Sequence, residues 1–175
     1  MNPEKFRDYY INLLPSNSLD LNLKLDEFVN FPVEKVGQLN ISQLDKDFLT
    51  ISGFPADAAP FLSFGLNNDI FLEPLSLIED IPQGSHCKMI GHNSNGDIIC
   101  IDESDAGSII YFNHDLNMSR EFINSSVISL AYSLCAYEQF QQTKDIEKCR
   151  KKISDYDPKA MQEDNFWWVE INLGM

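Results

Sequence analysis

The sequence predicts a single domain that combines an antiparallel β-meander with helices packed against it. Residues 88–115 contain three segments rich in β-branched and aromatic side chains, and two turn sequences separate these segments. Residues 122–140 then place apolar side chains at helical spacing. The chain of 175 residues is long enough for one sizeable hydrophobic core, but two full domains would leave both halves small. We therefore expect one domain over residues 1–175.

The two turns of the meander carry residues that suit hairpins. Asn95-Gly96 tolerates positive φ, and in the sequence Ser104-Asp105-Ala106-Gly107 the glycine is suited to the left-handed position that closes a short loop. The residues between and after the turns suit a pleated, partly buried surface: Ile98, Ile99, Ile101, Ile109, Ile110, Tyr111 and Phe112. We expect the meander to form the centre of the sheet.

The first fifty residues predict a helix, a strand and a second helix. Apolar side chains recur at three- and four-residue steps from Phe6 to Leu14, which predicts a helix that stops before Pro15. Leucines alternate with polar residues over 19–25, as in a strand wet on one face, either an edge strand or a hairpin arm. Ser42 is a plausible N-cap for a helix ended by Gly53. We expect this helix to bury Leu44, Phe48 and Leu49.

The remaining elements flank the meander. Short strands are expected at Phe61–Phe64 and Ile70–Leu72, because short apolar runs alternate there with Pro, Gly and Asn. The helix within 122–140 would be capped by Asn124 or Ser125 and would lay an apolar stripe on the sheet. Asp157-Pro158 predicts the start of another helix. The tail fits either a helix or a strand, and we expect Trp167 or Trp168 to dock on the core. The stripe consists of Val127, Leu130, Ala131 and Leu134.

The charge distribution points to a basic partner. The net charge is −14, on a chain with an ordinary globular composition of 43% hydrophobic residues, so the charge repels nucleic acid and anionic membranes. Segment Asp47–Ser119 contains eleven acidic residues and one basic residue, Lys88. Such an unbalanced face favours docking of a cationic protein, although solvated acidic loops would also explain it. The residues we expect to bind a partner are Asp97, Asp102, Glu103, Asp105, Glu79 and Asp80.

Sequence motifs give no support for catalysis or for a cofactor. The chain has no glycine-rich phosphate loop, no serine elbow and no calcium loop. The four cysteines are scattered, so we expect reduced and mostly buried thiols. The N-terminus lacks the features of a signal peptide, so we expect a cytoplasmic protein. The residues that could approach one another as zinc ligands match no paired-ligand pattern: His86, Cys87, His92, Cys100 and His114. We therefore expect neither a metal nor a cofactor.

The chain contains several short motifs: G-F-P at 53–55, I-G-H-N-S-N-G-D-I-I-C-I-D at 90–102, G-S-I-I-Y at 107–111, F-I-N-S-S-V at 122–127, and D-P-K-A at 157–160 with a later F-W. Together these motifs resemble the SUKH superfamily, most closely the fourth SUKH family of bacterial immunity proteins. The resemblance covers roughly the last two thirds of the chain, and the first fifty residues match less closely. It implies an α+β fold with a central mixed or antiparallel sheet. It also implies a non-catalytic protein that neutralises a cognate toxin, often a nuclease or deaminase.

Three functional hypotheses follow. The preferred one is an inhibitor that occludes a toxin with a basic surface through Asp97, Asp102, Glu103 and Asp105, and we expect all four to be replaceable without loss of folding. The second is a small metal-dependent hydrolase that uses three histidines with nearby carboxylates. The third is a regulatory scaffold, as eukaryotic relatives in the superfamily look like that. The histidines of the second hypothesis are His86, His92 and His114.

Overall fold

The computed structural model of the chain describes residues 2–15, 26–65, 70–77 and 81–173. Within these ranges the fold is α+β, as predicted, with antiparallel sheets and helices. A six-stranded sheet has the order β3-β4-β5-β6-β7-β8, and β1 pairs with β2 in a separate two-stranded sheet. The strands are β1 Phe28–Val29, β2 Phe54–Pro55, β3 Asp57–Ala58, β4 Leu62–Ser63, β5 Cys87–Asn93, β6 Ile98–Asp102, β7 Ser108–Asn113 and β8 Ser119–Asn124.

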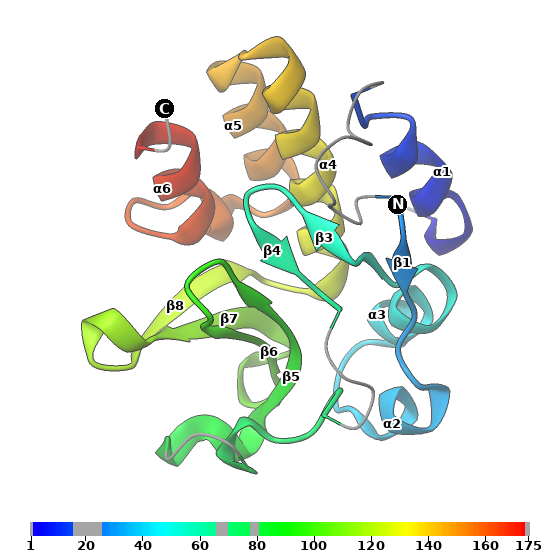
Figure 1. Cartoon of the computed structure of the whole chain (residues 1–175), viewed down its shortest axis with the longest axis vertical. Coiled ribbons are helices and arrows are strands. Elements are labelled where there is room, and N and C mark those ends of the chain that lie inside the picture. Colours follow the sequence, from blue (N-terminus) through cyan, green and yellow to red (C-terminus); the bar gives the residue numbers. More distant parts are fainter. Residues whose placement is uncertain (1, 16–25, 66–69, 78–80, 174–175) are drawn as a thin grey trace.

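The helices lie in two groups (Figure 1). Helices α1, α4, α5 and α6 lie beside one another at one end of the molecule, and α2 and α3 lie near β1. Within the described ranges, no helix has both the length and the apolar composition needed to cross a bilayer. The α-helices are α1 Pro3–Ile11, α2 Val33–Gln38, α3 Gln43–Asp47, α4 Val127–Thr143, α5 Ile146–Tyr156 and α6 Phe166–Leu173.

The predicted meander is confirmed as β5, β6 and β7. Strand β6 pairs with β5 from His92↔Ile98 to Cys87↔Asp102, with a bulge between Met89 and Gly91. The second turn contains the short 3₁₀ helix Glu103–Asp105, after which Gly107 adopts the left-handed conformation with φ +84°. A Cβ atom at this glycine would lie 2.8 Å from Ile41 Cγ2, so backbone conformation and packing both favour glycine.

Strand β8 was not predicted. It pairs with β7 across a turn in which Asn117 and Met118 both have positive φ, at 56° and 59°, although the turn contains no glycine. Helix α4 consequently begins at Val127, with Ser126 as its N-cap in a capping box with Ser129. The expected N-caps Asn124 and Ser125 are wrong, because both side chains bond Asp157 instead.

The N-terminal predictions are confirmed in part. Helix α1 is present, and Ser42 caps α3 by accepting a hydrogen bond from the backbone N–H of Asp45, but α3 continues as a π-helical turn up to Ser52. Leu44 is 52% exposed, so its expected burial is wrong, because the short helix turns that face toward solvent. The strand expected over 19–25 lies outside the described residues.

The other local predictions divide in the same way. Strand β4 lies within the expected Phe61–Phe64 segment. The strand expected at Ile70–Leu72 is wrong, because these residues form a turn in which Leu72 has φ 61°. The Asp157-Pro158 prediction is confirmed as the short 3₁₀ helix Pro158–Met161. The tail is the helix α6, and the expected docking of a tryptophan is confirmed because Trp167 is fully buried.

The core lies between the sheet and α4, with an aromatic cluster extending it toward α1. The predicted stripe of Val127, Leu130, Ala131 and Leu134 is fully buried. Beside it, Phe6 contacts Phe48 with ring centroids 4.8 Å apart. The core thus fixes the positions of the meander turns on one side and of the helical end on the other.

Candidate partner-binding surface

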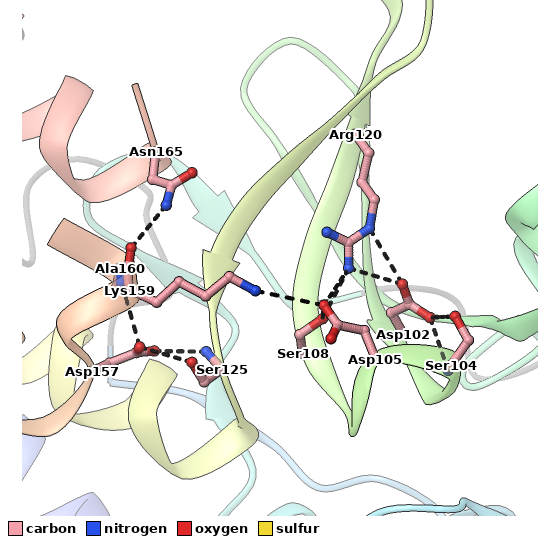
Figure 2. A network of polar contacts seen from close by, with 10 residues as sticks. All are labelled: Asp102, Ser104, Asp105, Ser108, Arg120, Ser125, Asp157, Lys159, Ala160 and Asn165. Carbon is pink, nitrogen blue, oxygen red and sulfur yellow. Dashed lines mark hydrogen bonds and ion pairs between the residues drawn. The ribbon is translucent and has the colours of Figure 1, made fainter. Parts of the chain in front are cut away.

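Asp102, at the end of β6, is held by groups from the following turn and from β8 (Figure 2). Arg120 Nη2 donates to Asp102 Oδ2 at 2.9 Å, and the Ser104 hydroxyl donates to Oδ1 at 2.6 Å. The Asp102 side chain is only 7% exposed. Burial raises the pKa of this carboxyl, but the hydrogen bonds from Ser104 and Arg120 outweigh burial, and the pKa is lowered. Asp102 is therefore an ionised structural group.

Asp105 belongs to the same network but lies at its exposed edge. Its Oδ2 atom accepts from Arg120 Nη2 at 2.9 Å and from the Ser108 hydroxyl at 3.0 Å, and Lys159 Nζ lies 3.7 Å away. The side chain is 46% exposed. The pKa of Asp105 is lowered, mainly by the hydrogen bond from Ser108. This carboxylate is thus stabilised within the protein and also open to a partner.

Asp97 lies in the other meander turn and is buried. It accepts from Asn93 Nδ2 at 2.9 Å, and His114 Nδ1 lies 2.5 Å from its Oδ1. Burial raises its pKa, but hydrogen bonds from His114 and Asn93 outweigh burial, so the pKa is lowered. A small cavity of about 150 Å³, lined also by Phe112 and Met118, lies beside this pair. Asp97 thus links the first meander turn to the residue that follows β7, His114.

Glu103 is the fourth predicted carboxylate of the meander. Its Oε1 accepts from the backbone N–H of Asn40 at 2.6 Å, and Lys88 Nζ lies 3.7 Å from Oε2. The structure therefore brings Asp102, Glu103 and Asp105 together at one turn and places Asp97 at the other. Glu79 and Asp80 lie outside the described residues.

The expected charge imbalance at these turns needs correction. Arg120 is the residue immediately after segment Asp47–Ser119, and Lys159 lies far along the chain, yet both bind carboxylates of the second turn. Lys88 adds a third cation next to Glu103. The three carboxylates of this turn therefore face three basic groups. The excess of acid in the sequence segment does not produce an uncompensated acidic turn.

A second polar network was missed by the sequence reasoning, which assigned Asp157 only to a helix start. Asp157 is buried and accepts from the backbone N–H of Ser125 at 2.6 Å, the Ser125 hydroxyl at 2.8 Å and Asn124 Nδ2 at 3.0 Å. Asn124 also accepts from Trp167 Nε1 at 2.8 Å. Three of the short motifs, around residues 124, 157 and 167, thus meet in one network. The signal for it was the recurrence of polar residues beside apolar ones in those motifs.

Within the described residues, the three histidines of the hydrolase hypothesis do not converge on one centre. His114 contacts Asp97 and Asp115, whereas His92 Nδ1 lies beside the backbone oxygen of Asn93, and His86 is exposed. Among the described residues, no group of His, Cys, Asp and Glu is placed to hold a metal ion. Burial raises the pKa of the Cys87 thiol to about 11.

The cysteine prediction is confirmed for burial. Cys87, Cys100, Cys135 and Cys149 are all free and buried. Burial raises the pKa of Cys135 and of Cys149 to about 12, so both thiols are neutral near pH 7 and have little nucleophilic character. They act as small core residues.

Comparison with known proteins gives one match. The model of the SUKH-4 immunity protein family matches residues 14–173. No curated protein and no solved structure shows a significant match.

Proposed function

The chain belongs to the SUKH-4 immunity protein family, and on that premise we propose that it binds and neutralises a cognate bacterial toxin inside the producing cell. The family match over residues 14–173 is the observation that carries this proposal. The protein acts by binding alone, without catalysis or a cofactor. The toxin is an effector that acts on nucleic acid and therefore has a basic surface around its own site.

The charge of the chain supports a cationic partner. A net charge of −14 creates a field that accelerates association with a basic protein and is screened as salt increases. Exposed carboxylates contribute to this field even where they do not touch the partner. The long-range attraction therefore depends on the whole molecule, and the contact residues decide where the toxin docks.

The predicted contact residues have different roles in the proposal. Asp105 offers an exposed carboxylate at the second meander turn. Asp115 lies at the opposite end of β7, next to His114, which bonds Asp97 of the first turn, and its side chain is 71% exposed. Asp97 and Asp102 are buried, so they position the turns instead of contacting the toxin directly. Glu103 reaches the surface only in part. Glu79 and Asp80 remain part of the proposed surface.

The proposal predicts that a gene adjacent to the gene of this chain encodes a secreted protein with a toxic C-terminal domain, and the test uses that domain as the partner. The chain should prevent killing when both are co-expressed, and the two purified proteins should form a complex. We expect Asp105→Asn/Asp115→Asn to reduce the association rate constant roughly two- to fivefold at low salt and much less at high salt.

The matched control is Glu34→Gln/Asp47→Asn, which removes two negative charges from helices α2 and α3. A site at the meander turns predicts a smaller effect for this control. If both double variants reduce the association rate constant equally, net charge alone accelerates association and the meander turns are not the docking site. Killing that continues despite soluble, folded protein would contradict the function itself.

A further inference from the structure

Helices α1, α4 and α5 lie at the same end of the molecule (Figure 1). Residues from all three helices line a groove of about 560 Å³. Each helix contributes one tyrosine to its wall: Tyr9 from α1, Tyr132 from α4 and Tyr156 from α5. Cys135 and Ala136 form its buried floor. The groove is thus an aromatic surface assembled from segments far apart in the sequence.

The tyrosines are held in place but not covered. The rings of Tyr132 and Tyr156 stack with centroids 3.6 Å apart and planes 9° apart. Gln139 Nε2 donates to the Tyr9 hydroxyl at 3.1 Å. Yet Tyr9 is 45% and Tyr156 is 56% exposed. Ordered aromatic rings that stay accessible are typical of residues that dominate protein interfaces, because little side-chain entropy is lost on binding.

The charges at the groove oppose the charge of the whole molecule. Lys5 and Lys152 line it together with one acidic residue, Asp155. Lys152 donates to the amide oxygen of Gln139, and the Asp155 carboxylate binds Lys151, at 2.7 Å. Among the described residues, no carboxylate lies within ion-pair distance of Lys5 or Lys152. The two ammonium groups and one carboxylate that line the groove leave a local excess of one positive charge, on a chain with net charge −14.

The groove is suited to binding and not to covalent chemistry. Its only thiol, Cys135, has a pKa raised to about 12 by burial, so it is neutral near pH 7. Burial also raises the pKa of Tyr132, so its hydroxyl keeps its proton. The remaining groups are hydroxyl donors, ammonium groups and apolar ring faces. They match carboxylates next to an apolar or aromatic side chain.

We propose that this groove binds an acidic segment of the toxin, with carboxylates at Lys5 and Lys152 and an apolar side chain on the Tyr132–Tyr156 stack. This inference rests on the proposed function. A toxin that meets the acidic body of this protein with basic residues, and the groove with acidic ones, can dock in only one orientation. Contacts of opposite charge at two separate places on the protein thereby set the orientation of the complex.

The experiment titrates full-length protein with the purified toxin domain by isothermal titration calorimetry. We expect Lys5→Glu/Lys152→Glu to increase the dissociation constant at least about tenfold, and Tyr156→Ala to increase it to a similar extent. The matched control is Lys144→Glu/Lys148→Glu, which makes the same charge change at the start of α5 but outside the groove. Thermal unfolding of every variant checks that the fold is retained.

The outcomes separate the two proposals. If the wild-type protein binds the toxin and the groove variants bind it with the same affinity, the groove proposal is wrong and the toxin-binding function remains supported. An equal loss in the groove and control variants would also overturn the groove proposal, because net charge alone would then explain the effect. Self-association of the free protein that Tyr156→Ala abolishes would assign the groove to a second copy. No binding by the folded wild-type protein would remove both proposals together.

Discussion

At the scale of single residues, Arg120 determines the electrostatic character of the second meander turn. Its guanidinium reaches the carboxylates of Asp102 and Asp105 and the hydroxyl of Ser108 (Figure 2). Asp102 is buried in this network and Asp105 is at its surface. A buried ionised group loses its hydration, so its hydrogen bonds and its ion pair must replace the lost water. An aspartate therefore has a structural role at position 102, whereas the aspartate three residues later is exposed and available to a partner.

Two substitutions of the same chemistry test this difference. Asp102→Asn should lower the free energy of unfolding by about 2 kcal/mol, because Arg120 and Ser104 lose a buried charged acceptor. Asp105→Asn should lower it by less than about 1 kcal/mol, because that pair is screened by solvent. Urea unfolding of both variants measures the difference. Equal losses would contradict the structural role of Asp102 and would restore the expectation that all four acids are replaceable.

At the scale of elements, Asp157 joins the start of α4 to the end of α5. Its carboxylate accepts bonds from Asn124, the last residue of β8, from Ser125, which follows it, and from the backbone N–H of Ala160, at 3.3 Å. Trp167 of α6 donates to the same asparagine. The segments around Asn124, Asp157 and Trp167 thus meet in one buried network, in which Asp157 and Asn124 are the acceptors.

Removing the Asp157 carboxylate should loosen the helical end of the molecule. We expect Asp157→Ala to cost about 3 kcal/mol, because several buried donors then lack a partner. Asp155→Ala, two residues earlier on the exposed face of α5, should cost less than about 1 kcal/mol. Chemical denaturation measures both variants, and near-ultraviolet circular dichroism reports the environment of Trp167. A variant Asp157→Ala as stable as the control would show that water replaces the carboxylate.

Two glycines, one in a meander turn and one in helix α2, provide a second test at this scale. Gly107→Ala should destabilise the protein by about 1–2 kcal/mol, because alanine is strained at positive φ and its Cβ would approach Ile41. Gly37→Ala, in helix α2 with open space around the added Cβ, should stabilise it by about 0.5–1 kcal/mol. Thermal unfolding distinguishes opposite signs directly. A gain in stability for both variants would contradict the left-handed assignment.

At the scale of the whole molecule, titration of the meander carboxylates links stability to pH. The pKa values of Asp97, Asp102 and Asp105 are lowered in the folded state. Acids of this kind stabilise the protein above their unfolded-state pKa, and the contribution is lost as the pH falls through the folded-state pKa. The pKa values of Glu138 and Glu170 are raised, mainly by burial, so these two acids act in the opposite direction. Their contribution is lost as the pH rises through their folded-state pKa.

The meander carboxylates have the larger number of internal partners, so we expect the free energy of unfolding to fall as the pH drops from about 5 to about 2. Asp102→Asn should show a smaller fall over this interval, because its own contribution to the titration is absent. Urea unfolding at successive pH values measures both curves. Parallel curves for the two proteins would mean that Asp102 has the same pKa in the folded and unfolded states.

Sequence patterns predicted correctly those elements that are determined by interactions between residues close together in the sequence. The meander and the buried stripe of α4 were predictable, because side-chain alternation, helical spacing and turn residues act within a few positions. Strand β8 was not, because Ser119–Asn124 runs into the apolar pattern of α4 and its pairing with β7 depends on a turn without glycine. The burial of Leu44 was wrongly predicted for a related reason. The sequence of a short helix does not specify which of its faces packs on the core, because that depends on tertiary contacts.

The sequence by itself determined the antiparallel meander, the long helix after it, the acidic net charge and the resemblance to an immunity family, because each depends on residue type and short-range spacing. Only the tertiary structure decided which carboxylates are compensated. Arg120 and Lys159 reach the second turn through strand pairing and helix packing, and Asp102 is buried by the same contacts. The tyrosine groove likewise exists only after three helices meet. Burial and ion pairing depend on contacts between residues that are far apart in the sequence, and local sequence patterns do not specify those contacts.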